Sequence, residues 1–221
     1  TLRGGFILVL AAGLWGSYLL LDQAWFTDWL IYLSVAWWLV VTYALTRYSR
    51  IEPANPGPDP IRAAMGLVVL IPLWVALVLL HGSVEDGPLT VLFLLILIWV
   101  ADSGAYFAGS RWGKRKLAPV ISPGKSWEGV YGAVAGALLC GALLAWYRGD
   151  DAGALWLLPV CVLTVLISVV GDLFESLLKR RMAMKDSGNL LPGHGGVLDR
   201  IDSLTAAAPV FLLGLQLAAV L

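Results

Sequence analysis

Residues 89–108 read LTVLFLLILIWVADSGAYFA, and Asp102 is the only charged residue among them. As an α-helix, a stretch of about 20 apolar residues is just long enough to cross the hydrocarbon core of a bilayer. Helix is the expected form because lipid offers the backbone no hydrogen-bond partners. The stretch therefore predicts a membrane-spanning helix, and the charge within it marks Asp102 as a candidate functional residue.

The rest of the chain shares this apolar character. Of its 221 residues, 59% are hydrophobic and only 14% are charged, and the mean hydropathy is +0.82. Soluble domains carry about 25% charged residues, so this composition favours a membrane protein. Seven apolar stretches lie roughly at 4–21, 29–46, 63–80, 89–108, 128–147, 154–178 and 203–221. The sequence therefore predicts an all-α fold, a polytopic transmembrane helical bundle of about seven spans.

The basic residues predict how the chain is oriented. Fourteen of the fifteen Lys and Arg residues fall before the first stretch or in alternate loops, and Arg148 alone lies on the other side. By the positive-inside rule, the basic side is cytoplasmic. We expect an integral protein of a bacterial-type inner membrane whose active site faces the cytoplasm. We do not expect the first stretch to be a cleaved signal peptide, because more spans follow it.

The chain divides into two parts by the length of its loops. We assign 1–97 to N-terminal transmembrane helices and 98–221 to a catalytic transmembrane region. The second part contains the two longer cytoplasmic loops, 109–127 and 179–202. Any chemistry must sit in these loops and on the helix ends beside them.

Acidic side chains recur near the cytoplasmic ends of the predicted spans. They are Asp102, Glu128, Asp172, Glu175, Asp199 and Asp202. A charged group inside a span costs at least about 2.5 kcal/mol, so such groups usually have a function. Asp172 and Glu175 are three residues apart, as are Asp199 and Asp202, so each pair shares a helix face. Ser168 and Lys179 extend the first pair into a polar stripe.

Clustered carboxylates beside basic loops suit a magnesium-dependent phosphate reaction. Mg²⁺ binds through one or two carboxylates plus substrate phosphates, and two metals can clamp an in-line transfer. We predict two metal ions, of which the second could be a different cation. The predicted ligands are Asp102, Asp172, Glu175, Asp199 and Asp202. The alternative is that these acids only pair with Lys and Arg to hold helices together. For Glu128 or Asp202 taken alone, this explanation is as good as metal binding.

The 179–202 loop adds a glycine-rich turn to these charges. Pro192, Gly193, Gly195 and Gly196 allow the backbone to approach a ligand closely, and its amides can hold phosphate. Lys185-Asp186-Ser187-Gly188 precedes this turn, and Asp199-Arg200-Ile201-Asp202 follows it. This combination of a glycine-rich turn with acids and bases is a far more specific signal of a functional site than a glycine-rich turn alone.

The loop and its flanks resemble the signature of the phosphatidate cytidylyltransferases, also called CDP-diacylglycerol synthases. The matching positions are Ser176, Lys179, Arg180, Lys185, Asp186, Pro192, His194, Gly195, Gly196, Asp199, Arg200 and Asp202. A second block, residues 101–129, is similar to the first conserved region of that family. Gly124 departs from it, because the family more often has a second Lys beside Lys125. The resemblance covers roughly residues 98–205.

The resemblance implies a reaction in which CTP and phosphatidate give CDP-diacylglycerol and pyrophosphate, for phospholipid biosynthesis. The residues that it implies for catalysis are Asp102, Asp172, Lys185, Asp199 and Arg200. Those that it implies for substrate binding are Ser122, Lys125, Ser126, Lys179, Arg180, Asp186, Ser187, Gly188, His194, Gly195 and Gly196. For His194, a phosphate contact and a structural role in the turn both remain open.

Two other functions remain as alternatives. A CTP-dependent lipid kinase of the polyprenol or dolichol type would transfer the γ-phosphoryl group and not the nucleotide. An ion-coupled transporter would place its acids near the bilayer midplane and often shows inverted repeats. Here the acids lie towards one face and no repeat is visible.

The expected partners are CTP, phosphatidate and membrane lipids, with no nucleic acid. A homodimer is a further possibility, because small residues in the fifth stretch permit close helix contact. These residues are Gly132, Ala133, Gly136 and Ala137. Cys140 and Cys161 lie in apolar stretches and predict no disulfide.

Overall fold

The computed structural model describes residues 2–48, 50–54, 57, 59–82, 86–149, 154–188, 190 and 195–218. Its helices are α1 (Leu2–Leu19), α2 (Ala24–Arg47), α3 (Pro60–Gly82), α4 (Gly87–Trp112), α5 (Trp127–Arg148), α6 (Leu157–Arg181) and α7 (Leu198–Leu217). A short 3₁₀ helix covers Ala154–Trp156, and a hairpin of β1 (Lys116–Ala118) and β2 (Ser122–Ser126) joins α4 to α5. Each predicted apolar stretch corresponds to one helix, so the all-α bundle is confirmed.

The number of membrane spans is a separate matter. Within the described residues, five helices, α2 to α6, are long and apolar enough to cross a bilayer. The apolar run Gly4–Leu19 is shorter than the others, and α7 is not among the five. The structure therefore supports an integral membrane bundle, but the expected seven spans are not confirmed.

The position of α7 explains its lower hydrophobicity. Every residue from Ser203 to Pro209 is buried, including Ala206, Ala207 and Ala208. A helix that is buried all round lies inside a bundle and not at its surface. Because protein surrounds this part of α7, small and hydroxyl side chains can replace the large apolar ones that lipid contact would favour.

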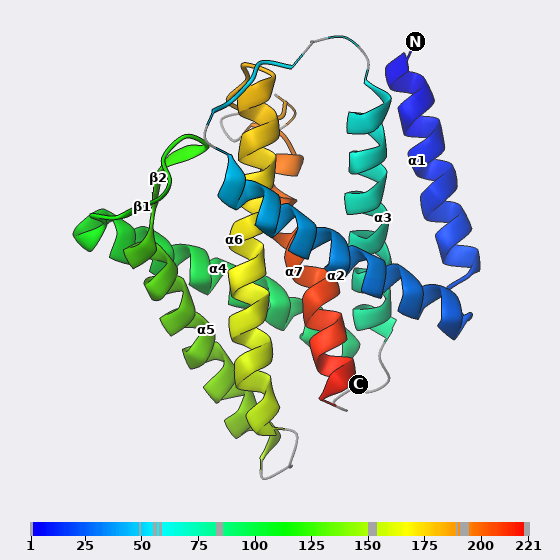
Figure 1. Ribbon diagram of the computed structural model, residues 1–221. Coiled ribbons are helices and arrows are strands. Elements are labelled where there is room, and N and C mark those ends of the chain that lie inside the picture. The colour runs from blue at the N-terminus through cyan, green and yellow to red at the C-terminus, as the bar shows by residue number, and fades with distance from the viewer. Residues whose placement is uncertain are drawn as a thin grey trace.

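The helices pack as neighbouring pairs (Figure 1). α4 lies along α5, and α6 lies along α7. α2 runs across α6, α7 and α3, while α1 packs mainly on α3 at the edge of the bundle. The main hydrophobic core joins α3, α4, α5, α6 and α7 around residues such as Leu94, Val165 and Phe211. The core therefore draws on helices from both predicted parts of the chain, 1–97 and 98–221.

The contact between α4 and α5 uses the small residues noted in the sequence. A Cβ atom added to Gly104 would lie 2.6 Å from the carbonyl oxygen of Gly132, so neither position has room for a side chain. Ala133 and Ala137 on α5 are buried. The small residues therefore serve packing within one chain, and a homodimer stays a prediction without this support. Cys140 and Cys161 are buried free thiols, as expected.

The loop 109–127 contains a structure that the sequence did not predict. β1 and β2 pair antiparallel, with Lys116 opposite Ser126 and Ala118 opposite Ser122. Ser126 then caps α5, because its Oγ accepts a hydrogen bond from the Gly129 N–H at 3.2 Å. This cap ties the hairpin to the start of α5.

Candidate active site

The candidate site is a cavity of about 410 Å³ between α4, α5, α6, α7 and the hairpin. Its polar lining consists of Asp102, Tyr106, Lys125, Ser126, Ser168, Asp172, Asp199, Asp202 and Ser203. Apolar residues, among them Ala101, Ala133 and Val165, line the rest. Both sequence blocks that carried the family resemblance therefore meet at one amphipathic cavity.

Lys125 and Asp172 form an ion pair on the wall of this cavity. The Lys125 Nζ lies 2.5 Å from Asp172 Oδ2, and Ser176 Oγ donates to Asp172 Oδ1 at 3.2 Å. The two charged side chains keep 24% and 31% of their surface exposed. The pair joins the hairpin to α6 and remains accessible to a ligand in the cavity.

Lys179 and Asp199 form a second pair, between α6 and the first turn of α7. The Lys179 Nζ lies 2.7 Å from Asp199 Oδ1 and 3.4 Å from Glu175 Oε2. Asp199 Oδ2 also accepts hydrogen bonds from Ser187 N, Ser187 Oγ and Gly196 N, at 2.9, 2.9 and 2.7 Å. Burial would raise the pKa of Asp199, but these donors outweigh it and hold that pKa below its usual range. Asp199 therefore connects the glycine-rich loop to α6.

Glu175 lies apart from the large cavity. It lines a separate, apolar pocket of about 190 Å³ between α3, α6 and α7, which Asp202 also lines. Glu175 is 5% exposed, and within the described residues its oxygens accept no hydrogen bond. The polar stripe on α6 is therefore divided, with Ser168 and Asp172 facing one cavity and Glu175 the other.

Glu128 does not line the cavity either. Its Oε1 lies 3.4 Å from Arg115 Nε, and its Oε2 accepts a hydrogen bond from the Arg115 backbone N–H at 3.2 Å. Arg115 also donates to the Tyr131 hydroxyl at 3.1 Å. Glu128 thus supports the base of the hairpin, in line with the alternative in which it only pairs with a basic residue.

The remaining described residues of the predicted site do not line the cavity. Ser122 lies in β2, and Ser187, Gly188, Gly195 and Gly196 lie in the loop next to Asp199. Four predicted residues are exposed and do not line the cavity: Arg180, Lys185, Asp186 and Arg200. His194 lies outside the described residues. The substrate-binding roles of all these residues stay predictions.

Three polar lining residues were not among the predicted site residues: Ser168, Tyr106 and Ser203. Ser168 lies one helical turn before Asp172, and its place in the polar stripe was the available signal. Tyr106 lies one turn after Asp102 and is 70% exposed. It could have been found from the same spacing argument on α4.

The carboxylate oxygens on the cavity wall suit magnesium, although the described residues form no site with three or more protein ligands. In the part of the chain that the structure describes, no three His, Cys, Asp or Glu side chains gather closely enough to hold a metal ion. Mg²⁺ needs only one or two carboxylates, because it takes its other ligands from water and substrate phosphates. Asp102, Asp172, Asp199 and Asp202 offer such oxygens on the wall of one cavity.

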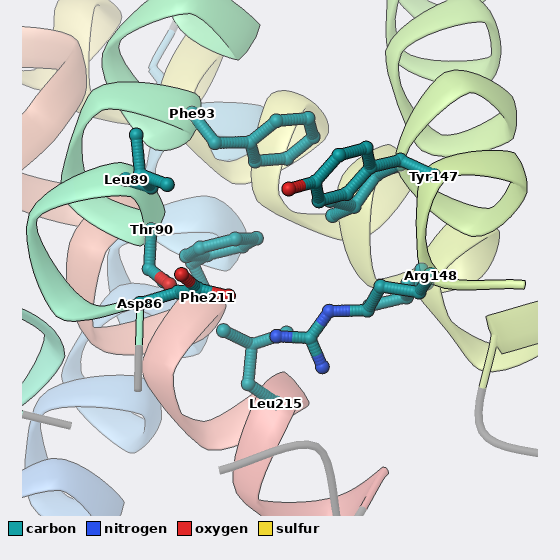
Figure 2. Close-up of a pocket in the computed structure, with 10 residues that line it drawn as sticks. Asp86, Leu89, Thr90, Phe93, Tyr147, Arg148, Phe211 and Leu215 are labelled. Atoms are coloured by element: carbon teal, nitrogen blue, oxygen red, sulfur yellow. The ribbon is translucent and has the colours of Figure 1, made fainter. Parts of the chain in front are cut away.

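Figure 2 shows a different and smaller cavity, of about 60 Å³. It lies at the opposite ends of α4 to α7, and side chains such as Leu89, Phe93 and Phe211 line it. Asp86 and Arg148 are its charged residues. It contains none of the predicted site residues.

Comparisons with known proteins agree with the motifs. The profile of the Cytidylyltransferase family matches residues 2–218. A phosphatidate cytidylyltransferase of Pseudomonas aeruginosa is 50% identical over 183 residues, which are 81% of this chain and 66% of that protein. One of Haemophilus influenzae is 42% identical over 187 residues, 80% of this chain and 65% of that protein. The chain thus spans just under two thirds of the length of these two relatives. It belongs to the cytidylyltransferase family.

Proposed function

We propose that the protein transfers the cytidylyl group of CTP to phosphatidate, which gives CDP-diacylglycerol and pyrophosphate for phospholipid biosynthesis. The observation that carries this proposal is the amphipathic cavity, where Lys125 and Asp172 face the same space as apolar residues such as Ala133 and Val165. A reaction between a nucleotide and a membrane lipid needs charged residues for the phosphates and apolar residues for the lipid. The names of the relatives support the same substrates.

The reaction joins two phosphates. An oxygen of the lipid phosphate attacks the α-phosphorus of CTP, and the bond from that phosphorus to the bridging oxygen breaks to release pyrophosphate. A phosphate monoester is already a nucleophile near neutral pH, so no general base is required. Magnesium, when bound, would neutralise charge that develops on the phosphates. Asp172 and Asp199, with Asp102 next, would hold it.

Lys125 and Asp172 would change partners when substrate binds. Alone, the two side chains neutralise each other at 2.5 Å. A nucleotide–metal complex brings both a negative charge for Lys125 and a positive charge for Asp172. Because the pair is partly exposed, water can assist this exchange, and neither charge is left without a partner.

The membrane and its sidedness belong to the same proposal. We place the protein in a bacterial inner membrane with the cavity towards the cytoplasm, where CTP is found. The support is the asymmetry of the Lys and Arg residues, because the cavity lies at the same ends of α4 and α6 as the basic loops.

Product identification tests the proposal. Purified protein in detergent would receive α-labelled CTP, phosphatidate and Mg²⁺, beside Asp172→Asn and a matched control, Asp86→Asn, in the small cavity of Figure 2. We expect labelled lipid and pyrophosphate from the wild type and the control, and neither from Asp172→Asn. Release of CDP without labelled lipid would indicate a lipid kinase. A protein with no metal-dependent CTP turnover would favour the transporter.

A further inference from the structure

We propose that Ile121 is a positioning residue for cytidylyl transfer, which anchors the hairpin on α6 and thereby keeps Lys125 at the cavity. Tyr48 and Ile51, which follow α2, complete this anchor. None of the three was a predicted site residue, and Tyr48 and Ile51 lie far from both motif blocks. The inference deepens the proposed function and rests on it for its catalytic consequence, but its structural part can be measured without turnover.

The hairpin meets α6 near both ends of β2. Ile121, in the turn just before β2, is 2% exposed and forms a buried cluster with Leu173 and Leu177 of α6. These two leucines are one helical turn apart, so they share a face of α6. Near the other end of β2, Lys125 pairs with Asp172. An apolar contact and an ion pair therefore hold one strand against the same helix.

The ion pair alone cannot fix the position of the hairpin. Because Lys125 and Asp172 are partly exposed, their pair contributes little to stability. In the proposed reaction the pair also separates when substrate binds. The position of Lys125 must then depend on a contact that substrate leaves unchanged. Ile121 is buried and lies outside the lining of the large cavity, so its apolar contact persists while Lys125 changes partners.

The chain that follows α2 packs on the same cluster. Tyr48 and Ile51 lie against its buried residues, together with Leu45 at the end of α2. The Ala54 N–H donates to the Arg181 carbonyl oxygen at 2.8 Å, which fixes this part of the chain at the C-terminal end of α6. Figure 1 shows the chain leaving α2 near the hairpin and crossing that end of α6. A segment without any motif thus supports the hairpin that carries Lys125.

The base of the hairpin is held by other contacts. The Trp127 N–H donates to the Arg115 carbonyl oxygen at 2.9 Å, and the Arg115 side chain pairs with Glu128. These contacts fix where the hairpin starts and ends. Ile121 lies at the turn, where its N–H donates to the Ala118 carbonyl oxygen at 3.2 Å. Loss of the Ile121 side chain would therefore release the turn while the base and α5 stay in place.

Hydrogen exchange of the backbone amides would test the anchor directly. Wild type in detergent would be compared with Ile121→Ala and with a matched control, Val120→Ala, which changes the exposed neighbour in the same turn. In Ile121→Ala we expect the amides at position 121 and in β2 to exchange about fivefold faster or more. The amides of Trp127 and of α6 should keep their wild-type rates, and Val120→Ala should change none of these rates.

A second variant tests the anchor from the side of α2. Ile51→Ala leaves the hairpin sequence intact and removes part of the cluster, so it should speed exchange in β2 by about twofold or more. It also keeps the test decisive if Ile121→Ala does not fold. Unchanged exchange in β2, in Ile121→Ala or in an Ile51→Ala protein that replaces it, would overturn the proposal.

A double-mutant cycle with Lys125 would test the catalytic part. Ile121→Ala should lower kcat/KM for CTP by about tenfold, and the conservative Ile121→Val should keep most of the wild-type value. In a Lys125→Met background, Ile121→Ala should cost less than about twofold, because there is no longer an ammonium group to position. Equal losses in both backgrounds would overturn the proposal, since Ile121 would then act on the fold and not through Lys125.

Failure of the anchor and failure of the proposed function give different results. A wild type that makes no labelled lipid would refute the proposed function and leave the exchange result standing. Normal lipid synthesis with unchanged exchange in β2 of Ile121→Ala would refute the anchor alone.

Discussion

Two lysine–aspartate pairs stand close to one another in this protein, and they differ in what surrounds them. Lys125 and Asp172 meet at 2.5 Å on the wall of the cavity, with 24% and 31% of their side chains exposed. Lys179 and Asp199 meet at 2.7 Å, with 18% and 9% exposed, inside a network of loop hydrogen bonds. Similar distances therefore accompany different surroundings: the first pair is partly exposed, and Asp199 of the second also accepts hydrogen bonds from the loop.

The largest expected effect follows from removing one charge of the exchangeable pair. Asp172→Asn should lower the rate of cytidylyl transfer by about 10³-fold, the size of loss typical of a group that stabilises charge in a transition state. Initial rates of lipid labelling would measure it. The free energy of unfolding of Asp172→Asn should hardly change. Near-normal rates of cytidylyl transfer in this variant would contradict the catalytic role of the Lys125–Asp172 pair.

The next effect concerns stability and distinguishes the two lysines. Lys179→Met should lower the free energy of unfolding by about 3 kcal/mol, because it leaves the Asp199 carboxylate, 9% exposed, without its cation. Lys125→Met should lower it by less than about 1 kcal/mol, because its pair is partly solvated. Denaturant titration in the same micelles would compare the two variants. Equal losses would remove the distinction on which the comparison depends.

The smallest effect concerns the glycine beside each pair. Gly196→Ala should cost about 2 kcal/mol, because the new methyl group meets Ser187 Oγ and the Gly188 backbone. Gly124→Ala, next to Lys125, should be neutral within about 0.5 kcal/mol, because nothing lies within 4 Å of its added Cβ atom. Thermal unfolding of both variants would check this. A neutral Gly196→Ala would mean that the loop is not packed closely on Asp199.

Much of the fold could be predicted from the sequence, because bilayer thickness sets the length of each apolar run. The sequence also placed Asp102 and Asp172 near the ends of those runs, and both line the large cavity. The number of spans did not follow, since an enclosed helix such as α7 needs less apolar surface than one that faces lipid. The short hairpin was missed because it has no apolar alternation.

The division of the acidic residues was also beyond the sequence. Asp172 and Glu175 are about 60° apart around α6, which is close enough to share a face by spacing alone. The packing of α3 and α7 against α6 decides that they line different cavities. Likewise, the bonds from Ser187 and Gly196 to Asp199 depend on a loop conformation that residue types do not specify.

Metal binding in the presence of CTP tests most directly whether the large cavity is the active site. Mn²⁺, as a paramagnetic substitute for Mg²⁺, would be titrated into the wild type, Asp172→Asn and the control Asp86→Asn, and the free ion followed by electron paramagnetic resonance. The account predicts that Asp172→Asn loses high-affinity Mn²⁺ binding and that Asp86→Asn, in the small cavity, retains it. Loss of binding in Asp86→Asn, with binding retained in Asp172→Asn, would contradict it.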